Sequence, residues 1–239
     1  MDSKVLNSSF KGAVQRCFLY NCVLIFSDDL NVSLSVKQLQ CSRGDVSLFE
    51  GLSFEINSGQ LMWLEGRNGS GKTTLLRTLC GLFLQDSGTV EWQGEVIKSI
   101  PDAFYRKLFY LGHQNALKSD LNPIENLQTL CRLVGSSVTE EQTEAALNQF
   151  GLAGHEETPV RKLSQGQQRR VALSRLLLTE APLWILDEPF VALDIAAVEL
   201  LQSVIVSHVE QGGMAILTTH QALPIPEEKM IRLSLDCYV

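Results

Sequence analysis

The pattern of apolar and polar residues along the chain predicts two kinds of β-strand. In the first part of the chain, short strands that alternate apolar and polar residues are separated by turns, which is typical of an antiparallel layer. These strands are expected at residues 34–39, 46–49, 52–56 and 89–94. Mostly apolar runs instead predict buried strands, which are expected at residues 61–64, 107–112, 183–186 and 214–219.

Helical spacing of apolar residues predicts helices between these strands. One helix is expected over residues 72–82, a second begins at Pro123, and a third opens with cap-like residues at Thr139. A long amphipathic helix is expected over about residues 164–180. Strands that alternate with helices imply an α/β fold with a mostly parallel core sheet. We therefore expect this core to carry an antiparallel β subdomain and a helical subdomain over about residues 115–180.

Composition narrows the class of protein. The chain has 239 residues, of which 45% are hydrophobic and 20% charged, as expected for a globular protein with a sizeable core. The net charge of −7, with no long basic stripe, argues against a nucleic-acid partner. The six cysteines are scattered without a C-x-x-C pair, which favours buried or incidental thiols over a metal site. No apolar run approaches the roughly 18–20 residues that span a bilayer.

The first residues do not fit the pattern of the rest. A basic start followed by the short apolar run 17–26 is also a feature of signal peptides, but no A-x-A-like cleavage site follows. We expect residues 1–33 to be an N-terminal extension of uncertain structure and residues 34–239 to form the functional domain.

A glycine-rich motif directly follows the apolar run 61–64. Residues 66–73, GRNGSGKT, fit the phosphate-loop pattern G-x-x-x-x-G-K-[ST]. A strand that ends in such a turn and continues into a helix points successive backbone N–H groups at one spot, where the helix dipole adds partial positive charge. The Lys72 amine would reach the β- and γ-phosphates, and the Thr73 hydroxyl would bind Mg²⁺.

A glycine-rich turn that binds nothing is the alternative for this motif, but all four fixed positions of the pattern are present. The sequence therefore predicts a site for a nucleoside triphosphate and Mg²⁺. The expected phosphate-binding residues are Gly66, Arg67, Asn68, Gly69, Ser70, Gly71, Lys72, Thr73 and Thr74.

Two acidic residues follow the apolar run 183–186. Asp187 ends this run and is placed to hold Mg²⁺ opposite Thr73. Glu188 comes next and is the candidate base that orients or deprotonates the attacking water. An ordinary polar strand end is the alternative for this pair, but the phosphate loop earlier in the chain favours a catalytic role.

A second motif identifies a family. Residues 163–170, LSQGQQRR, resemble the LSGGQ signature of the ABC-transporter ATPases, with Gln165 in place of the first glycine. Ser164, Gly166 and Gln167 would form a second anion site at a helix N-terminus. One chain cannot easily aim two helix starts at the same γ-phosphate. The resemblance implies a head-to-tail dimer, in which the signature of one copy closes over the ATP held by the phosphate loop of the other.

The remaining family elements occur in the expected order. By resemblance, Gln114 senses Mg²⁺ and the attacking water, Asp194 supports communication across the dimer, and His220 contacts the γ-phosphate. The resemblance covers about residues 34–235 and implies the phosphate-loop NTPase fold of ABC type. One departure is that the family's aromatic residue that stacks on adenine falls near Cys41, where this chain has no Tyr, Phe or Trp.

Residues 159–176 and the Thr219-His220-Gln221 segment favour one branch of the family. They look like the haem-exporter ATPases of bacterial cytochrome c maturation. That resemblance implies a peripheral subunit on the cytoplasmic side of the inner membrane, which powers haem export or delivery together with membrane-spanning permease subunits B and C. An ABC transporter ATPase for another substrate is the alternative. A soluble ABC ATPase that acts on ribosomes or DNA is disfavoured by the acidic balance and by the single nucleotide domain.

Overall fold

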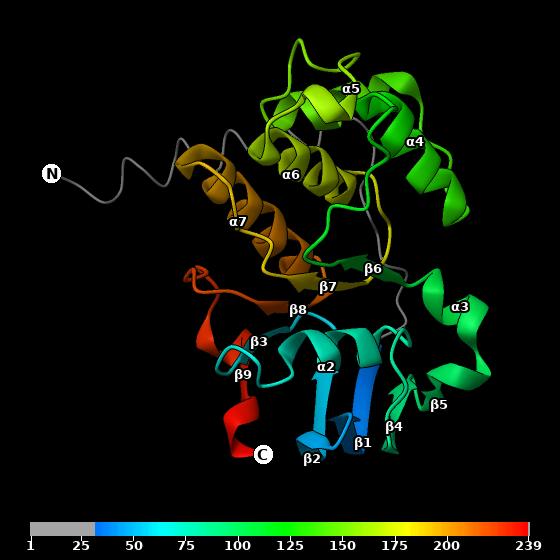
Figure 1. The fold of residues 1–239 in the computed structure, drawn as a ribbon, viewed down its shortest axis with the longest axis vertical. Helices are drawn as coiled ribbons and strands as arrows, with labels where there is room; N and C mark the ends of the chain where they lie inside the picture. The colour runs from blue at the N-terminus through cyan, green and yellow to red at the C-terminus, as the bar shows by residue number, and fades with distance from the viewer. Residues whose placement is uncertain (1–31, 239) are drawn as a thin grey trace, which may run out of the picture.

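The computed structural model describes residues 32–238 (Figure 1). The extension expected at residues 1–33 therefore lies almost wholly outside the described residues. The described part contains a four-stranded sheet of order β2-β1-β4-β5 and a five-stranded sheet of order β6-β7-β8-β3-β9. The predicted α/β fold, with an antiparallel layer beside a parallel core sheet, is confirmed.

The antiparallel sheet consists of β1 (Ser33–Arg43), β2 (Val46–Asn57), β4 (Ser87–Trp92) and β5 (Glu95–Val96). The prediction of two separate strands at 46–49 and 52–56 is wrong, because β2 runs through Gly51 as one strand. Gly51 has a φ of +67°, and the pairing of β1 with β2 shifts register between Leu39 and Cys41. This irregularity breaks the alternation in the sequence without ending the strand.

The parallel sheet consists of β3 (Leu61–Glu65), β6 (Leu108–Leu111), β7 (Leu183–Asp187), β8 (Met214–Thr218) and β9 (Met230–Ser234). Every residue of β7 and β8 is buried, which explains their continuous apolar runs. Their register pairs Asp187 with Thr218, so both residues lie at the carboxyl edge of the sheet.

Helices cover both faces of this sheet (Figure 1). One core cluster joins α2 (Lys72–Leu79) and the antiparallel sheet to one face of β7 and β8, and contains Leu183 and Ile185. A second cluster joins α7 (Ile195–Glu210) to the other face and contains Trp184 and Leu186. The short helix α3 (Pro101–Tyr105) precedes β6. Helices α7 and α3 and strand β9 were not predicted from the sequence.

The predicted helical subdomain consists of α4 (Pro123–Leu133), α5 (Glu140–Gln149) and α6 (Gln165–Ser174), which share a third core cluster. Each helix begins with a capping box, at Asn122, Thr139 and Ser164. The expected extension of the last helix to about residue 180 is wrong: α6 gives way to a 3₁₀ turn at Arg175–Leu177. The chain must then turn into β7, and Pro182 disfavours helical geometry at the preceding residue.

No helix within residues 32–238 is both long and apolar enough to cross a membrane.

Candidate active site

The phosphate loop joins β3 to α2 in the predicted strand–loop–helix arrangement. Gly66, Gly69 and Gly71 have φ angles of +147°, +88° and +96°, which side chains rarely adopt. A Cβ atom on Gly66 would lie 2.5 Å from Ser70 Oγ, so a larger residue would obstruct the loop. The Lys72 amine donates hydrogen bonds to the carbonyls of Gly66 (2.6 Å) and Arg67 (2.9 Å). These contacts hold the Lys72 amine against the inner side of the loop.

Two observations show that this loop fits a phosphate group. Unlike α4, α5 and α6, helix α2 has no side chain among the described residues that caps its N-terminus. The Ser70 hydroxyl is buried and has no hydrogen-bond partner within residues 32–238. Uncapped N–H groups and an unsatisfied hydroxyl at a helix N-terminus are the partners that an anion requires. Thr73 and Thr74 lie in this first turn.

The predicted metal ligands Thr73 and Asp187 meet directly. Thr73 Oγ1 donates a hydrogen bond of 2.8 Å to Asp187 Oδ2, and Thr218 Oγ1 donates one of 2.9 Å to Asp187 Oδ1. Asp187 is only 3% exposed. A hydroxyl oxygen and a carboxylate oxygen at this distance are a suitable donor set for Mg²⁺. The third predicted ligand, Gln114, lies in the loop that follows β6 and lines a cavity that also includes Glu188.

A cavity of about 290 Å³, here the phosphate-side cavity, is lined by residues from three parts of the chain. Gly66 and Lys72 come from the phosphate loop, Glu188 follows β7, and His220 follows β8. The structure thus brings the candidate base and the candidate γ-phosphate contact beside the phosphate loop. Both lie at the carboxyl ends of parallel strands, which is where α/β proteins bind ligands.

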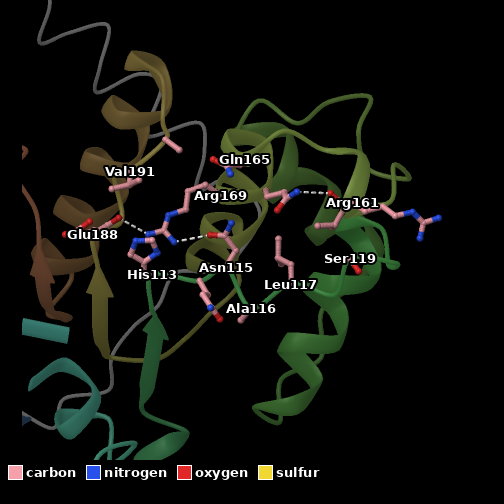
Figure 2. A pocket seen from close by; sticks show the side chains of 14 residues that line it. His113, Asn115, Ala116, Leu117, Ser119, Arg161, Gln165, Arg169, Glu188 and Val191 are labelled. Atoms are coloured by element: carbon pink, nitrogen blue, oxygen red, sulfur yellow. Dashed lines mark hydrogen bonds between the residues drawn. The ribbon is translucent and has the colours of Figure 1, made fainter. Parts of the chain in front are cut away.

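A larger cavity of about 480 Å³ also has Glu188 in its lining (Figure 2). It is lined by Gln114 and Asn115 of the loop after β6, by Gln165 and Arg169 of α6, and by Glu188. Glu188 therefore lines both cavities.

The signature residues begin α6 and lie beside the loop after Glu188. Ser164 Oγ accepts a hydrogen bond from the Gln167 N–H (3.2 Å), and Gln167 Oε1 accepts one from the Ser164 N–H (2.9 Å). A Cβ atom on Gly166 would lie 2.9 Å from the Ala192 carbonyl oxygen, so the close approach requires glycine. Neither Ser164 nor Gly166 nor Gln167 lines the phosphate-side cavity of its own chain.

Asp194 has a local partner. Its side chain accepts a hydrogen bond of 2.9 Å from the Ala197 N–H and so caps the N-terminus of α7. Arg170 Nη1 lies 3.9 Å from the Asp194 carboxylate. Asp194, which is expected to support communication across the dimer, therefore also caps a helix in its own chain.

Cys41 does not face a ligand. It is fully buried, and its Sγ lies 3.5 Å from Thr78 Oγ1 in the core. Burial raises the pKa of the Cys41 thiol. Cys80 and Cys131 are also free and buried, whereas Cys237 is exposed, so the prediction of buried or incidental thiols holds for the described cysteines.

The ABC transporter family model matches residues 49–191, which is more than half of the chain. The chain belongs to the ABC transporter family.

Curated members of this family are similar in sequence to this chain over most of its length. The "Cytochrome c biogenesis ATP-binding export protein CcmA" of Nitrosomonas europaea is 52% identical over 190 residues, covering 80% of this chain and 89% of that protein. The proteins of the same name from Dechloromonas aromatica and Escherichia coli K12 are 49% and 48% identical over 202 residues. Those alignments cover 84% of this chain and 99% and 96% of the two relatives.

Solved structures of ABC proteins share the fold. An ATP-binding subunit of an ABC transporter is 26% identical, with a TM-score of 0.72, and the match covers 84% of this chain and 85% of that one. A dimeric ATP-binding cassette in a post-hydrolysis state, bound to ADP and Pi, is 21% identical, with a TM-score of 0.69. That match covers 79% of this chain and 88% of that one.

Two polar residues at the centre of this ABC domain were not predicted from the sequence. Thr218 contacts both acidic residues, since its hydroxyl also accepts the Glu188 N–H at 2.8 Å. Arg169 is 4% exposed and contacts the backbone of Asp187 and Glu188. Burial lowers the pKa of Arg169, whereas the Asp187 and Glu188 carboxylates raise it. The signal for Thr218 was its place at the end of an apolar run, and that for Arg169 was its place in the signature helix.

Proposed function

We propose that this chain is the ATP-hydrolysing subunit of an ABC transporter that serves cytochrome c biogenesis through haem export or delivery. The observation that carries the proposal is its 48–52% identity, over 80–84% of its length, to relatives named as ATP-binding export proteins of cytochrome c biogenesis. The uncapped, glycine-rich phosphate loop beside Asp187 and Glu188 supplies the chemistry that such a subunit needs.

The phosphate loop and the end of β7 would bind ATP and Mg²⁺. Backbone N–H groups of residues 66–73 and the Lys72 amine would hold the phosphates, and Thr73, Asp187 and Gln114 would hold the metal. When bound, Mg²⁺ neutralises charge that develops on the phosphate oxygens. The direct hydrogen bond between Thr73 and Asp187 supports this assignment, because the same two oxygens would become neighbours on the metal.

Glu188 would accept a proton from the attacking water, and His220 would contact the γ-phosphate. Both residues line the phosphate-side cavity with Lys72. Asp187 is committed to two hydroxyl donors, whereas the Glu188 side chain lies at the junction of both cavities. Glu188 is therefore better placed than Asp187 to act as the base.

A second copy of the chain would complete the site. The residues at the start of α6, namely Ser164, Gly166 and Gln167, would contact the ATP held by the partner, and Asp194 would lie near the dimer interface. Two apolar side chains beside Asp194 support an interface here: Val191 is 51% exposed and Ile195 is 79% exposed.

Membrane-spanning permease subunits, B and C of the haem exporter, would be the other partners. The chain would then be peripheral to the cytoplasmic side of the inner membrane, with no nucleic acid involved. An ABC transporter for another substrate would use the same chemistry, because the substrate does not touch this chain.

A complementation assay separates these two functions. The host strain that lacks this chain should lose covalently bound haem in its c-type cytochromes, as measured by haem staining of membrane proteins. The wild-type chain should restore the stain. Lys72→Ala should not, because it removes the ammonium group that would bind the ATP phosphates. Lys98→Ala, which removes an exposed lysine after β5, is the matched control and should restore it. Normal cytochrome staining in the deletion strain would contradict the role in cytochrome c biogenesis and favour another substrate.

A further inference from the structure

Arg169 connects three segments of the site through one side chain. Its Nη2 donates hydrogen bonds to the carbonyls of Glu188 (2.8 Å) and Asp187 (3.2 Å), and its Nε donates to the Pro189 carbonyl (3.4 Å). Its Nη1 donates to the Gly112 carbonyl (3.2 Å) and to Asn115 Oδ1 (3.1 Å). Figure 2 shows the guanidinium between the end of β7 and the loop that contains Asn115.

The partners of Arg169 are unusual for a residue that only fills the core. Arg175, on the same chain segment, lies with its guanidinium 4.9 Å from the centre of the Phe109 ring. Arg169 instead uses all three of its nitrogens on the backbone around the candidate base and on the loop after β6. A planar guanidinium can hold several carbonyls in fixed relative positions, which an ammonium group cannot do.

The backbone that Arg169 contacts is in a conformation that needs support. Glu188 has a φ of +47°, which is uncommon for a residue with a side chain. Its N–H is held by Thr218 Oγ1 on one side, and its carbonyl is held by Arg169 Nη2 on the other. Such a conformation persists only where its surroundings hold it, and it decides where the Glu188 carboxylate points.

We propose that Arg169 is a positioning residue for ATP hydrolysis, which fixes the Glu188 backbone and ties it to α6 and to the loop after β6. The proposal rests on the proposed role of Glu188 as the base. Arg169 lies five residues after Ser164 on the helix that begins with the signature residues, so a displacement of that helix moves its guanidinium and, through it, the Glu188 carbonyl. Dimer closure over ATP at the start of α6 is thereby coupled to the placement of the base.

Steady-state kinetics and nucleotide binding of the full-length chain test this role. Arg169→Gln should lower kcat by about 10- to 100-fold, since a misplacement of about 1 Å can reduce a rate by that order. The KM for ATP and the affinity for a fluorescent ATP analogue should change by less than about threefold, because Arg169 does not contact the phosphate loop. Arg169→Lys keeps the charge but not the planar fork, and it should show the same split if Arg169→Gln does not fold.

Arg175→Gln is the matched control, because it removes a second, partly buried arginine from the same segment. It should lower the melting temperature and leave kcat per folded molecule close to wild type. Equal losses of kcat in the Arg169 and Arg175 variants, in proportion to their melting temperatures, would overturn the positioning role. Wild-type kcat in Arg169→Lys would also overturn it.

A double-variant cycle with Glu188→Gln separates this proposal from the proposed function. If Arg169 acts through Glu188, Arg169→Gln should lower the residual turnover of Glu188→Gln by less than about twofold, because the effects of residues that act as a unit are not additive. If the fold-losses in turnover of the two single variants multiply in the double variant, the positioning role is overturned and Glu188 remains the base. Wild-type turnover of Glu188→Gln alone would instead contradict the proposed function.

Discussion

Thr218 holds both acidic residues of the site through a single hydroxyl group. It donates to Asp187 Oδ1 at 2.9 Å and accepts the Glu188 N–H at 2.8 Å, and it is 1% exposed. Water cannot replace either contact without repacking at this depth. The relative placement of the proposed metal ligand and the proposed base therefore depends in part on this hydroxyl.

Thr218→Val should uncouple these two residues with little change in volume. The buried Asp187 oxygen and the Glu188 N–H would lose their partner, which costs about 1–3 kcal/mol of unfolding free energy. We expect denaturant melts to show this loss and ATPase assays to show a lower kcat. Thr218→Ser keeps the hydroxyl and is the matched control. If Thr218→Val has wild-type stability and kcat, this hydroxyl has no part in the site.

Several helices were predicted from the residues that mark their beginnings, but such marks were not sufficient, since α7 was missed although Asp194 caps it. The phosphate-loop strand and the helices at Pro123 and Thr139 were predicted because glycines, proline and capping residues mark their beginnings. In contrast, α7 was not predicted, although its polar residues Glu199, Gln202, Ser203, Ser207 and Glu210 lie on one face of the helix. Its buried residues do recur every four positions, at Ala197, Leu201, Ile205 and Val209, which was the available signal.

The parts of the candidate site that could be predicted are the phosphate-loop motif and the polar residues that follow apolar strands. The phosphate loop, Asp187, Glu188 and His220 stand at strand ends, and the structure gathers them as expected. Arg169 was not predicted, because most of its partners are backbone carbonyls, which every residue has. Its contacts depend on tertiary placement, and no spacing in the sequence reports them.

The cap of α7 offers a test at the level of an element. Asp194→Ala removes the acceptor for the Ala197 N–H and should destabilise the chain by about 1 kcal/mol, which lowers the melting temperature by about 2–4 °C. Asp194→Asn keeps a capping oxygen and should retain the wild-type melting temperature, because the exposed pair with Arg170 contributes little.

Calorimetry and ATPase assays on these two variants separate stability from dimer contact. If Asp194→Asn melts like wild type but loses ATPase activity, the charge acts across the dimer. An unchanged melting temperature in Asp194→Ala would show that the cap does not stabilise α7.

At the scale of the whole molecule, the site is divided. The phosphate loop and the start of α6 both lie at helix N-termini, but they line different cavities of the same chain. A head-to-tail pair of chains would bring the two kinds of helix start to one nucleotide. The dimeric cassette among the structural neighbours has the same fold.

Glu188→Gln should make the head-to-tail dimer detectable in solution. Without the base, turnover should fall by about 10²- to 10⁴-fold while ATP still binds, so that closed dimers accumulate. Sedimentation of the variant should show dimers with ATP and Mg²⁺ and monomers without them. Lys72→Ala in the same background should remain monomeric, because the phosphates are not held. A dimer that is equally stable without nucleotide would contradict closure driven by ATP.

Helix α6 contributes to two hydrophobic cores at once. Val171 belongs to the cluster of the helical subdomain, whereas Ala172 and Leu173 belong to the cluster beneath the parallel sheet. Because neighbouring residues of α6 are packed in both clusters, a displacement of this helix would disturb the packing of the helical subdomain and of the parallel sheet together.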